Sequence, residues 1–261
     1  MEEPQPQAAA RYGQFVTLRG GLSALIEALA TSLGEGVVQL RTAVESVSRS
    51  GPRRWHVATG RHSESALFDG VIVATAAPRS ANLLQSLHPE LAQQLAGIEY
   101  ASSAVITLIY RRDKIGHPLD AFGAVVPAVE NRPIVAASFL TTKFPGHAPA
   151  DRAVIRVFVG GVLQPSMVDR DDAELVAIAK RELAVLVAAH GEPLEAHVTR
   201  WRNSMPQYHV RHLLRVAEIE THVATHDGLQ LAGSGYRGVG IPQCVESGQK
   251  AAERLAKQLA N

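Results

Sequence analysis

The sequence predicts a mixed α/β protein in which a β-rich segment is inserted into a discontinuous outer domain. Residues 104–159 contain four β-rich runs separated by Pro, Gly, Asp and Asn, a spacing typical of a mostly antiparallel sheet. On both sides of this region, apolar residues at helical spacing alternate with short apolar strands. The last stretch thus returns to the pattern of the first, and we expect the two to form one domain.

The first stretch begins with a helix and continues with short strands. Its helix follows Gly20 and Gly21 and carries apolar residues at helical spacing, namely Leu22, Leu25, Ile26 and Leu29. Three strands and a second helix are expected at 37–47, 55–59, 71–74 and 78–87. The acidic, Pro-containing residues 1–13 are unlike a secretory signal and are expected to be a disordered lead-in.

The middle and last stretches are read in the same way. The four β-rich runs lie at 104–110, 122–127, 134–140 and 153–159. Asp171 and Asp172 precede an expected helix at 173–190, where acidic residues suit the positive end of the helix dipole. A strand is expected at 195–201, and another at 228–233, before a helix starting near Pro242. We therefore expect an outer domain at 14–78 and 202–261, and an inserted domain at 79–201.

Composition limits the function classes. The chain is 46% hydrophobic and 20% charged with a net charge of +1, which gives no reason to expect nucleic acid as a partner. The lone Cys244 excludes an internal disulfide and is typical of a cytoplasmic protein. No apolar run approaches the roughly 20 residues of a membrane-spanning helix. The pairs His209/His212 and His222/His226 have no third ligand nearby in sequence, so we expect no metal site.

The strongest chemical signal is the glycine-rich segment 231–242. Its four glycines, at 233, 235, 238 and 240, permit positive φ and let a ligand approach the backbone. The helix after Pro242 would direct its free amides and the positive end of its dipole at anything bound in the loop. From the residues alone, a ligand site and a tight strand-to-helix turn are equally compatible with this segment.

The chain from Phe15 onward resembles the protoporphyrinogen oxidases, which belong to the flavin-containing amine oxidase superfamily. The segment from Ala232 to Gly248 is similar to the C-terminal flavin motif of that family. Four further segments match in the same order: Phe15–Leu22, Val44 within a strand, Val71–Thr75, and Trp201 with Pro206, Gln207 and Tyr208.

The resemblance implies a partial FAD-linked oxidoreductase fold, in which 14–78 and 202–261 are the remnant of an FAD-binding domain. It also implies that residues 79–201 bind a porphyrinogen, which the family oxidises to a porphyrin in haem biosynthesis. Carried over residue by residue, the expected FAD neighbours are Val44, Ala74, Trp201, Gly233, Val239, Gly240 and Ile241. The resemblance names no catalytic residue, since hydride passes directly from tetrapyrrole to flavin.

Departures from the family pattern qualify this expectation. No Gly-x-Gly-x-x-Gly turn precedes Phe15, so this chain alone is not expected to be competent. Gly235 and Arg211 also depart from the family, which has a glycine in place of Arg211. The chain is then a truncated reading frame, one half of a split enzyme completed by a complementary polypeptide, or a non-catalytic binding module. Exposed sheet edges would favour a homodimer.

The alternative flavoproteins with a similar glycine-rich tail are the amine oxidases and the carotenoid desaturases. The sequence does not decide whether the protein attaches peripherally to a membrane.

Overall fold

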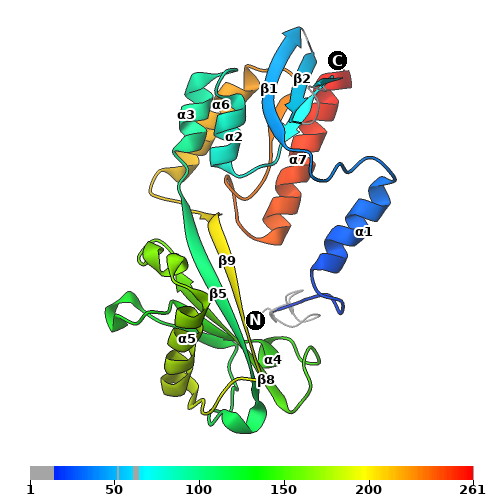
Figure 1. The fold of residues 1–261 in the computed structure, drawn as a ribbon. Coiled ribbons are helices and arrows are strands. Elements are labelled where there is room, and N and C mark those ends of the chain that lie inside the picture. The colour runs from blue at the N-terminus through cyan, green and yellow to red at the C-terminus, as the bar shows by residue number, and fades with distance from the viewer. Residues whose placement is uncertain (1–14, 52, 61–64, 261) are drawn as a thin grey trace, which may run out of the picture. The chain divides into compact units, whose positions relative to one another are not determined.

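A computed structural model describes residues 15–51, 53–60 and 65–260 (Figure 1). The chain divides into two compact units. The five-stranded unit comprises the chain up to Val38 together with Ser102–Arg202, and the glycine-loop unit comprises Gln39–Ala101 together with Asn203–Asn261. The expected lead-in at 1–13 lies outside the described residues.

The five-stranded unit is built on a single sheet. Its strands, in the order β6-β7-β8-β5-β9, are β6 (Gly123–Val125), β7 (Ala136–Phe139), β8 (Arg152–Gly160), β5 (Tyr100–Arg111) and β9 (Glu195–Pro206). The pairs β6–β7, β7–β8 and β8–β5 are antiparallel. Burial alternates along β5, so that Ile106, Leu108 and Tyr110 point into the core while their neighbours point outward.

Helix α5 (Asp172–Val187) covers this sheet. Asp171 caps its start by accepting a hydrogen bond from the amide of Glu174 at 2.8 Å, and Ala188 ends it in the left-handed conformation. Leu175 and Leu183 on α5 are fully buried in the same core as the sheet residues. The other helical segments are α1 (Ser23–Leu33), α4 (Leu140–Lys143), η2 (Arg112–Lys114), η3 (Ala128–Glu130) and η4 (Pro165–Asp169).

The glycine-loop unit contains two small sheets. An antiparallel meander is formed by β1 (Val44–Gly51), β2 (Arg54–Thr59) and β3 (Ser65–Phe68). A parallel pair is formed by β4 (Val71–Val73) and β10 (Leu229–Leu231). Trp55 on β2 is fully buried, and its indole nitrogen donates to the carbonyl of Asp227 at 3.2 Å, which joins the meander to the turn before β10.

Four helices complete this unit: α2 (Ala77–Leu84), α3 (Pro89–Ala96), α6 (His212–Ala224) and α7 (Ile241–Ala260). Leu84, Leu91 and Leu95 on α2 and α3 share a core with Val216 and Ile219 on α6. Figure 1 shows these three helices grouped together, with α7 running separately along β10 and β4.

The mixed α/β class with an antiparallel insert is confirmed. The first strand begins at Val44 rather than at 37, because Gly34, Gly36 and Arg41 have positive φ. The helix expected at 78–87 is present as α2, and α3 follows it as a further helix that was not predicted. Helix α6 was not predicted. The functional division into 14–78 with 202–261, and 79–201, stays a prediction.

Neither a membrane span nor a metal centre is found where the chain is described. No helix there is long and apolar enough to cross a membrane. No three His, Cys, Asp or Glu residues lie close enough there to hold a metal ion.

Candidate functional site

The glycine-rich loop runs from the end of β10 to the start of α7. The parallel pairing of β10 with β4 continues one residue into the loop, where the amide of Ala232 donates to the carbonyl of Val73 at 3.1 Å. The amide of Gly233 then donates to the hydroxyl of Ser247 on α7 at 3.0 Å. One end of the loop is therefore tied to both the sheet and the helix that follows it.

Gly233 leaves open space beside the loop. It has φ +126°, a conformation that favours glycine, and a Cβ placed on it would meet only the carbonyl oxygen of Ala74, at 4.0 Å. The space that a side chain would fill is thus free for the close approach of a planar group. Such open space is compatible with a backbone cradle for a ligand.

The start of α7 provides hydrogen-bond donors next to this loop. The amide of Cys244 closes the first helical turn on the carbonyl of Gly240 at 3.0 Å, and Pro242 has no amide hydrogen. Within the described chain, the amides of Ile241 and Gln243 have no acceptor. These donors carry the positive end of the dipole of a 20-residue helix and suit a negatively charged group.

Tyr208 holds the middle of the loop in place. Its hydroxyl donates to the carbonyl of Ser234 and accepts from the amide of Gly238 at 2.9 Å. One side-chain oxygen therefore bridges two main-chain groups four residues apart. Burial raises the pKa of Tyr208, although the Gly238 amide opposes the shift, so this hydroxyl keeps its proton at neutral pH.

His212 supports Tyr208 from the first turn of α6. The two rings stack with centroids 4.1 Å apart and planes 13° apart. Nε2 of His212 lies 2.8 Å from the carbonyl oxygen of Tyr236, and because a carbonyl only accepts, Nε2 carries the proton. We call Tyr208 and His212, with their contacts to the loop, the loop clasp.

Gly235 is required by packing. A Cβ at this buried position would lie 2.8 Å from the hydroxyl oxygen of Tyr100 and 3.5 Å from the Cβ of Ala77. The Tyr100 hydroxyl is fixed there because it accepts from the amide of Ala77 at 3.1 Å. The departure from the family pattern at Gly235 therefore has a local structural reason.

Four of the seven predicted FAD neighbours lie on this loop and at the helix start. These are Gly233, Val239, Gly240 and Ile241. The side chains of Val239 and Ile241 are about half exposed, at 50% and 49%, on either side of Gly240. Ala74 follows β4 and lies beside Gly233. The structure thus brings five of the predicted residues together, and their role as FAD neighbours stays a prediction.

The remaining two predicted residues lie elsewhere. Val44 begins β1, and its carbonyl accepts from Arg79 Nη2 at 2.6 Å, which ties the meander to α2. Trp201 lies on β9 in the five-stranded unit and is 54% exposed. For neither residue does the structure test a cofactor contact.

The loop clasp was missed as a functional feature by sequence reasoning. The sequence marks Tyr208 only as part of a segment that matches the family, and His212 only as one member of the His209/His212 pair considered as metal ligands. The apolar residues Val216, Ile219 and Val223, at helical spacing, could have signalled α6 and placed His212 in its first turn.

Comparisons with known proteins identify the family of the chain. Residues 4–256 match the family described as flavin containing amine oxidoreductase. The chain is 32% identical to the coproporphyrinogen III oxidase of Propionibacterium freudenreichii, over 92% of this chain and 45% of that protein. It is 31% identical to the protoporphyrinogen oxidase of Bos taurus, over 95% of this chain and 52% of that protein.

A solved structure supports the fold. The crystal structure of a protein provisionally named a protoporphyrinogen oxidase, from Exiguobacterium sp. 255-15, matches with a TM-score of 0.82 at 28% identity. The match covers 95% of this chain and 53% of that chain, so this chain spans about half the length of the relatives it matches. Because the family match covers nearly the whole sequence, the chain belongs to the flavin containing amine oxidoreductase family.

Proposed function

We propose that this chain supplies the flavin-facing part of an FAD-dependent oxidoreductase that converts a porphyrinogen to a porphyrin. The observation that carries the proposal is the path of residues 232–242, in which the open space beside Gly233 is followed by a helix start with free amides. The names of the similar proteins support the substrate class. The chain spans about half of their length.

The residues of the loop fit a flavin ring. FAD, when bound, supplies the redox chemistry by accepting hydride from a carbon of the tetrapyrrole. Gly233 would allow the backbone to approach the ring, whereas at Gly240 the ring would have to displace the Gln243 side chain, which occupies the space beside that glycine. The amides of Ile241 and Gln243 would stabilise negative charge on the pyrimidine side of the ring. The half-exposed side chains of Val239 and Ile241 would cover the ring and exclude water.

The other predicted neighbours receive roles consistent with their positions. Ala74 would contact the cofactor at the end of β4 through its main chain, and Val44 would lie near the adenine. Trp201 is proposed as a flavin neighbour from the sequence resemblance alone. In this proposal 14–78 and 202–261 form the partial FAD-binding domain, and 79–201 binds the porphyrinogen.

We further propose a complementary polypeptide as partner, with a homodimer as the alternative. Among the described strands, β4 pairs only with β10, and parallel sheets of two strands rarely stand alone. The outer edge of β4 would therefore accept another strand. Light scattering of the pure chain tests the homodimer, which a clean monomer would contradict.

We place the protein in the cytoplasm, with peripheral membrane attachment as a variant of this proposal.

A non-catalytic porphyrin-binding module is the second candidate function. This candidate predicts that the pure chain binds porphyrin without retaining flavin. An amine oxidase is a weaker candidate, because the cyclohexylamine oxidase from Brevibacterium oxydans matches at only 17% identity. A carotenoid desaturase rests on the sequence resemblance alone.

The test is a visible absorption spectrum of the purified chain after incubation with FAD and desalting. Retained flavin with a perturbed spectrum supports the proposal, and Gly233→Ala should then lower the retained fraction, because a Cβ enters the open space. Gly161→Ala is the matched control, since Gly161 also has positive φ and open surroundings but lies in the other unit. Turnover of coproporphyrinogen and protoporphyrinogen would be measured next.

Equal loss of flavin from both glycine variants would count against the assigned site, because backbone strain alone would then explain the result. A chain that retains no flavin, alone or with a complementary polypeptide, would contradict the proposal. The porphyrin-binding candidate would then be tested by titration with coproporphyrin.

A further inference from the structure

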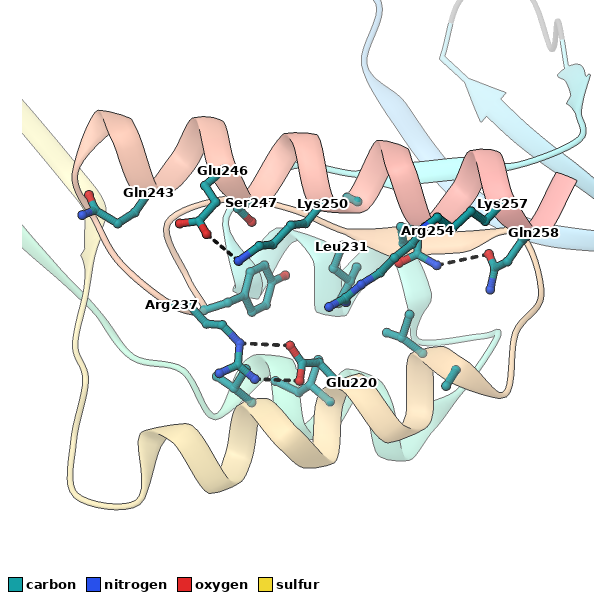
Figure 2. Close-up of a pocket in the computed structure, with 17 residues that line it drawn as sticks. Glu220, Leu231, Arg237, Gln243, Glu246, Ser247, Lys250, Arg254, Lys257 and Gln258 are labelled. Atoms are coloured by element: carbon teal, nitrogen blue, oxygen red, sulfur yellow. Dashed lines mark hydrogen bonds and ion pairs between the residues drawn. The ribbon is translucent and has the colours of Figure 1, made fainter. Parts of the chain in front are cut away.

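A second cavity lies on the glycine-loop unit, between α6 and α7 (Figure 2). Its volume is about 620 Å³, within the range of pockets that hold one small organic molecule. It is distinct from the cradle beside Gly233, because it is lined by the length of the two helices rather than by the glycines of the loop.

The floor and the α6 wall of this cavity are aliphatic. Val216, Ile219 and Val223 line it from α6, and Leu231 lines it from β10. Tyr236 is its aromatic residue and is almost fully buried. An inorganic ion would gain nothing from such a surface, whereas an alkyl chain would remove apolar area from water on both sides.

Four cations line the cavity, three of them on α7, and two of the four are paired with an acidic residue. Arg237 forms two hydrogen bonds with Glu220, at 3.1 and 2.7 Å. Lys250 is paired with Glu246 one turn earlier on α7. These contacts neutralise the cavity at the end nearer the glycine-rich loop.

Arg254 and Lys257 have no such partner. Neither forms an ion pair or hydrogen bond with any residue of the described chain. Figure 2 shows Arg254 extending from α7 toward the space between the helices, above the aliphatic floor. Arg254 is exposed, so its guanidinium is free to bind an anion at the mouth of the cavity, and a carboxylate can accept two parallel hydrogen bonds from it.

We propose that this cavity binds an aliphatic monocarboxylate, with its alkyl chain between α6 and α7 and its carboxylate on Arg254. The aliphatic lining favours an alkyl chain over a flat aromatic body, and the unpaired cation provides the complementary charge. The site adds to the proposed flavin function and does not depend on it, because Arg254 and the aliphatic side chains have no part in the cradle, although Gln243 and Ser247 line the cavity as well.

The test uses the purified chain without flavin, titrated with octanoate by calorimetry. Octanol, which has the same chain length and no charge, is the matched ligand. Octanoate should bind with one-to-one saturation. Arg254→Gln should weaken octanoate binding about tenfold and leave octanol binding unchanged, because only the charged contact is lost.

Two further variants separate the site from general effects. Arg54→Gln removes the same charge from an exposed position on β2, outside the cavity, and should not change octanoate binding. Ala224→Phe fills the α6 end of the cavity without changing charge and should weaken both ligands. Thermal unfolding of each variant checks that it is folded.

Octanoate binding that is unaffected by Arg254→Gln, or equally weakened by Arg54→Gln, would overturn the proposal. Equal affinities for octanoate and octanol would also overturn it. Failure of the flavin test would leave these outcomes unchanged, since no measurement here uses FAD.

Discussion

The Tyr208 hydroxyl makes a prediction that tests how the glycine-rich loop is held. Tyr208→Phe removes the one oxygen that bridges the carbonyl of Ser234 and the amide of Gly238. The aromatic ring remains, so its stacking on His212 at 4.1 Å is preserved. The substitution therefore isolates the two hydrogen bonds from the packing around them.

The magnitude follows from those two bonds. A typical protein hydrogen bond contributes a net ~0.5–1.5 kcal/mol. Tyr208 is 42% exposed, so water can reach part of this region once the hydroxyl is removed, and the largest penalties do not apply. We expect the loop to lose about 1–2 kcal/mol of local stability in total. This corresponds to an opening equilibrium about 5–30-fold larger, since ~1.4 kcal/mol is a factor of ten.

Hydrogen exchange of the Gly238 amide, followed by NMR, measures this opening directly. Exchange at Gly238 should become faster by that factor in Tyr208→Phe, while amides of α5 in the other unit keep their rates. Tyr110→Phe provides the control, because it makes the same chemical change on β5 of the five-stranded unit. It should leave Gly238 unaffected.

An unchanged Gly238 exchange rate would refute the reasoning, because it would mean that the loop keeps its shape without the bridge. A uniform acceleration of all amides would refute it differently, since the substitution would then act on global unfolding. Under the proposed function, the loosened loop should also lower the fraction of FAD retained after desalting.

Three further predictions concern the same unit. Burial lowers the pKa of His226, and His88 adds to the shift, so the unfolded chain binds this proton at a higher pH than the folded chain does. The melting temperature measured by circular dichroism should therefore fall as the pH decreases below about 6.5, and it should fall less steeply in His226→Gln. Arg211 has φ +70°, a conformation that favours glycine, so Arg211→Gly should raise the free energy of unfolding, measured in urea, by about 0.5–1 kcal/mol. A lower free energy of unfolding in this variant would contradict the assigned strain. Gly235→Ala should cost about 1–3 kcal/mol in the same assay, and less when Tyr100→Phe removes the clashing oxygen; equal costs in both backgrounds would contradict the packing argument.

The glycine-rich loop could be predicted because its signals are local. A short apolar strand, glycines with positive φ and a proline at the helix start all lie within 229–242, and the structure has β10, Gly233 and α7 in that order. The antiparallel insert was predictable for the same reason, since alternation along β5 and β8 appears in the sequence itself.

The support of the loop could not be predicted, because it depends on contacts between distant residues. Tyr208 lies 26 residues before Ser234 and 30 before Gly238, and nothing in the local pattern links them. The need for a glycine at position 235 could not be predicted either, since it depends on contact with Tyr100, which lies far earlier in the chain. Backbone strain at Arg211 appeared in the sequence only as a departure from the family glycine.

The contacts that shape the loop have a consequence for interpreting the flavin experiment. The partners of the loop, namely Val73, Ser247, Tyr208 and His212, all belong to the glycine-loop unit. Its conformation is therefore set within that unit, before any cofactor binds. If Gly238 is well protected from exchange and the chain still releases FAD, the ring cradle is formed, and what limits affinity is contact with the remainder of the cofactor. If Gly238 is unprotected, the cradle itself is unformed, and adding a complementary polypeptide should restore protection and flavin together.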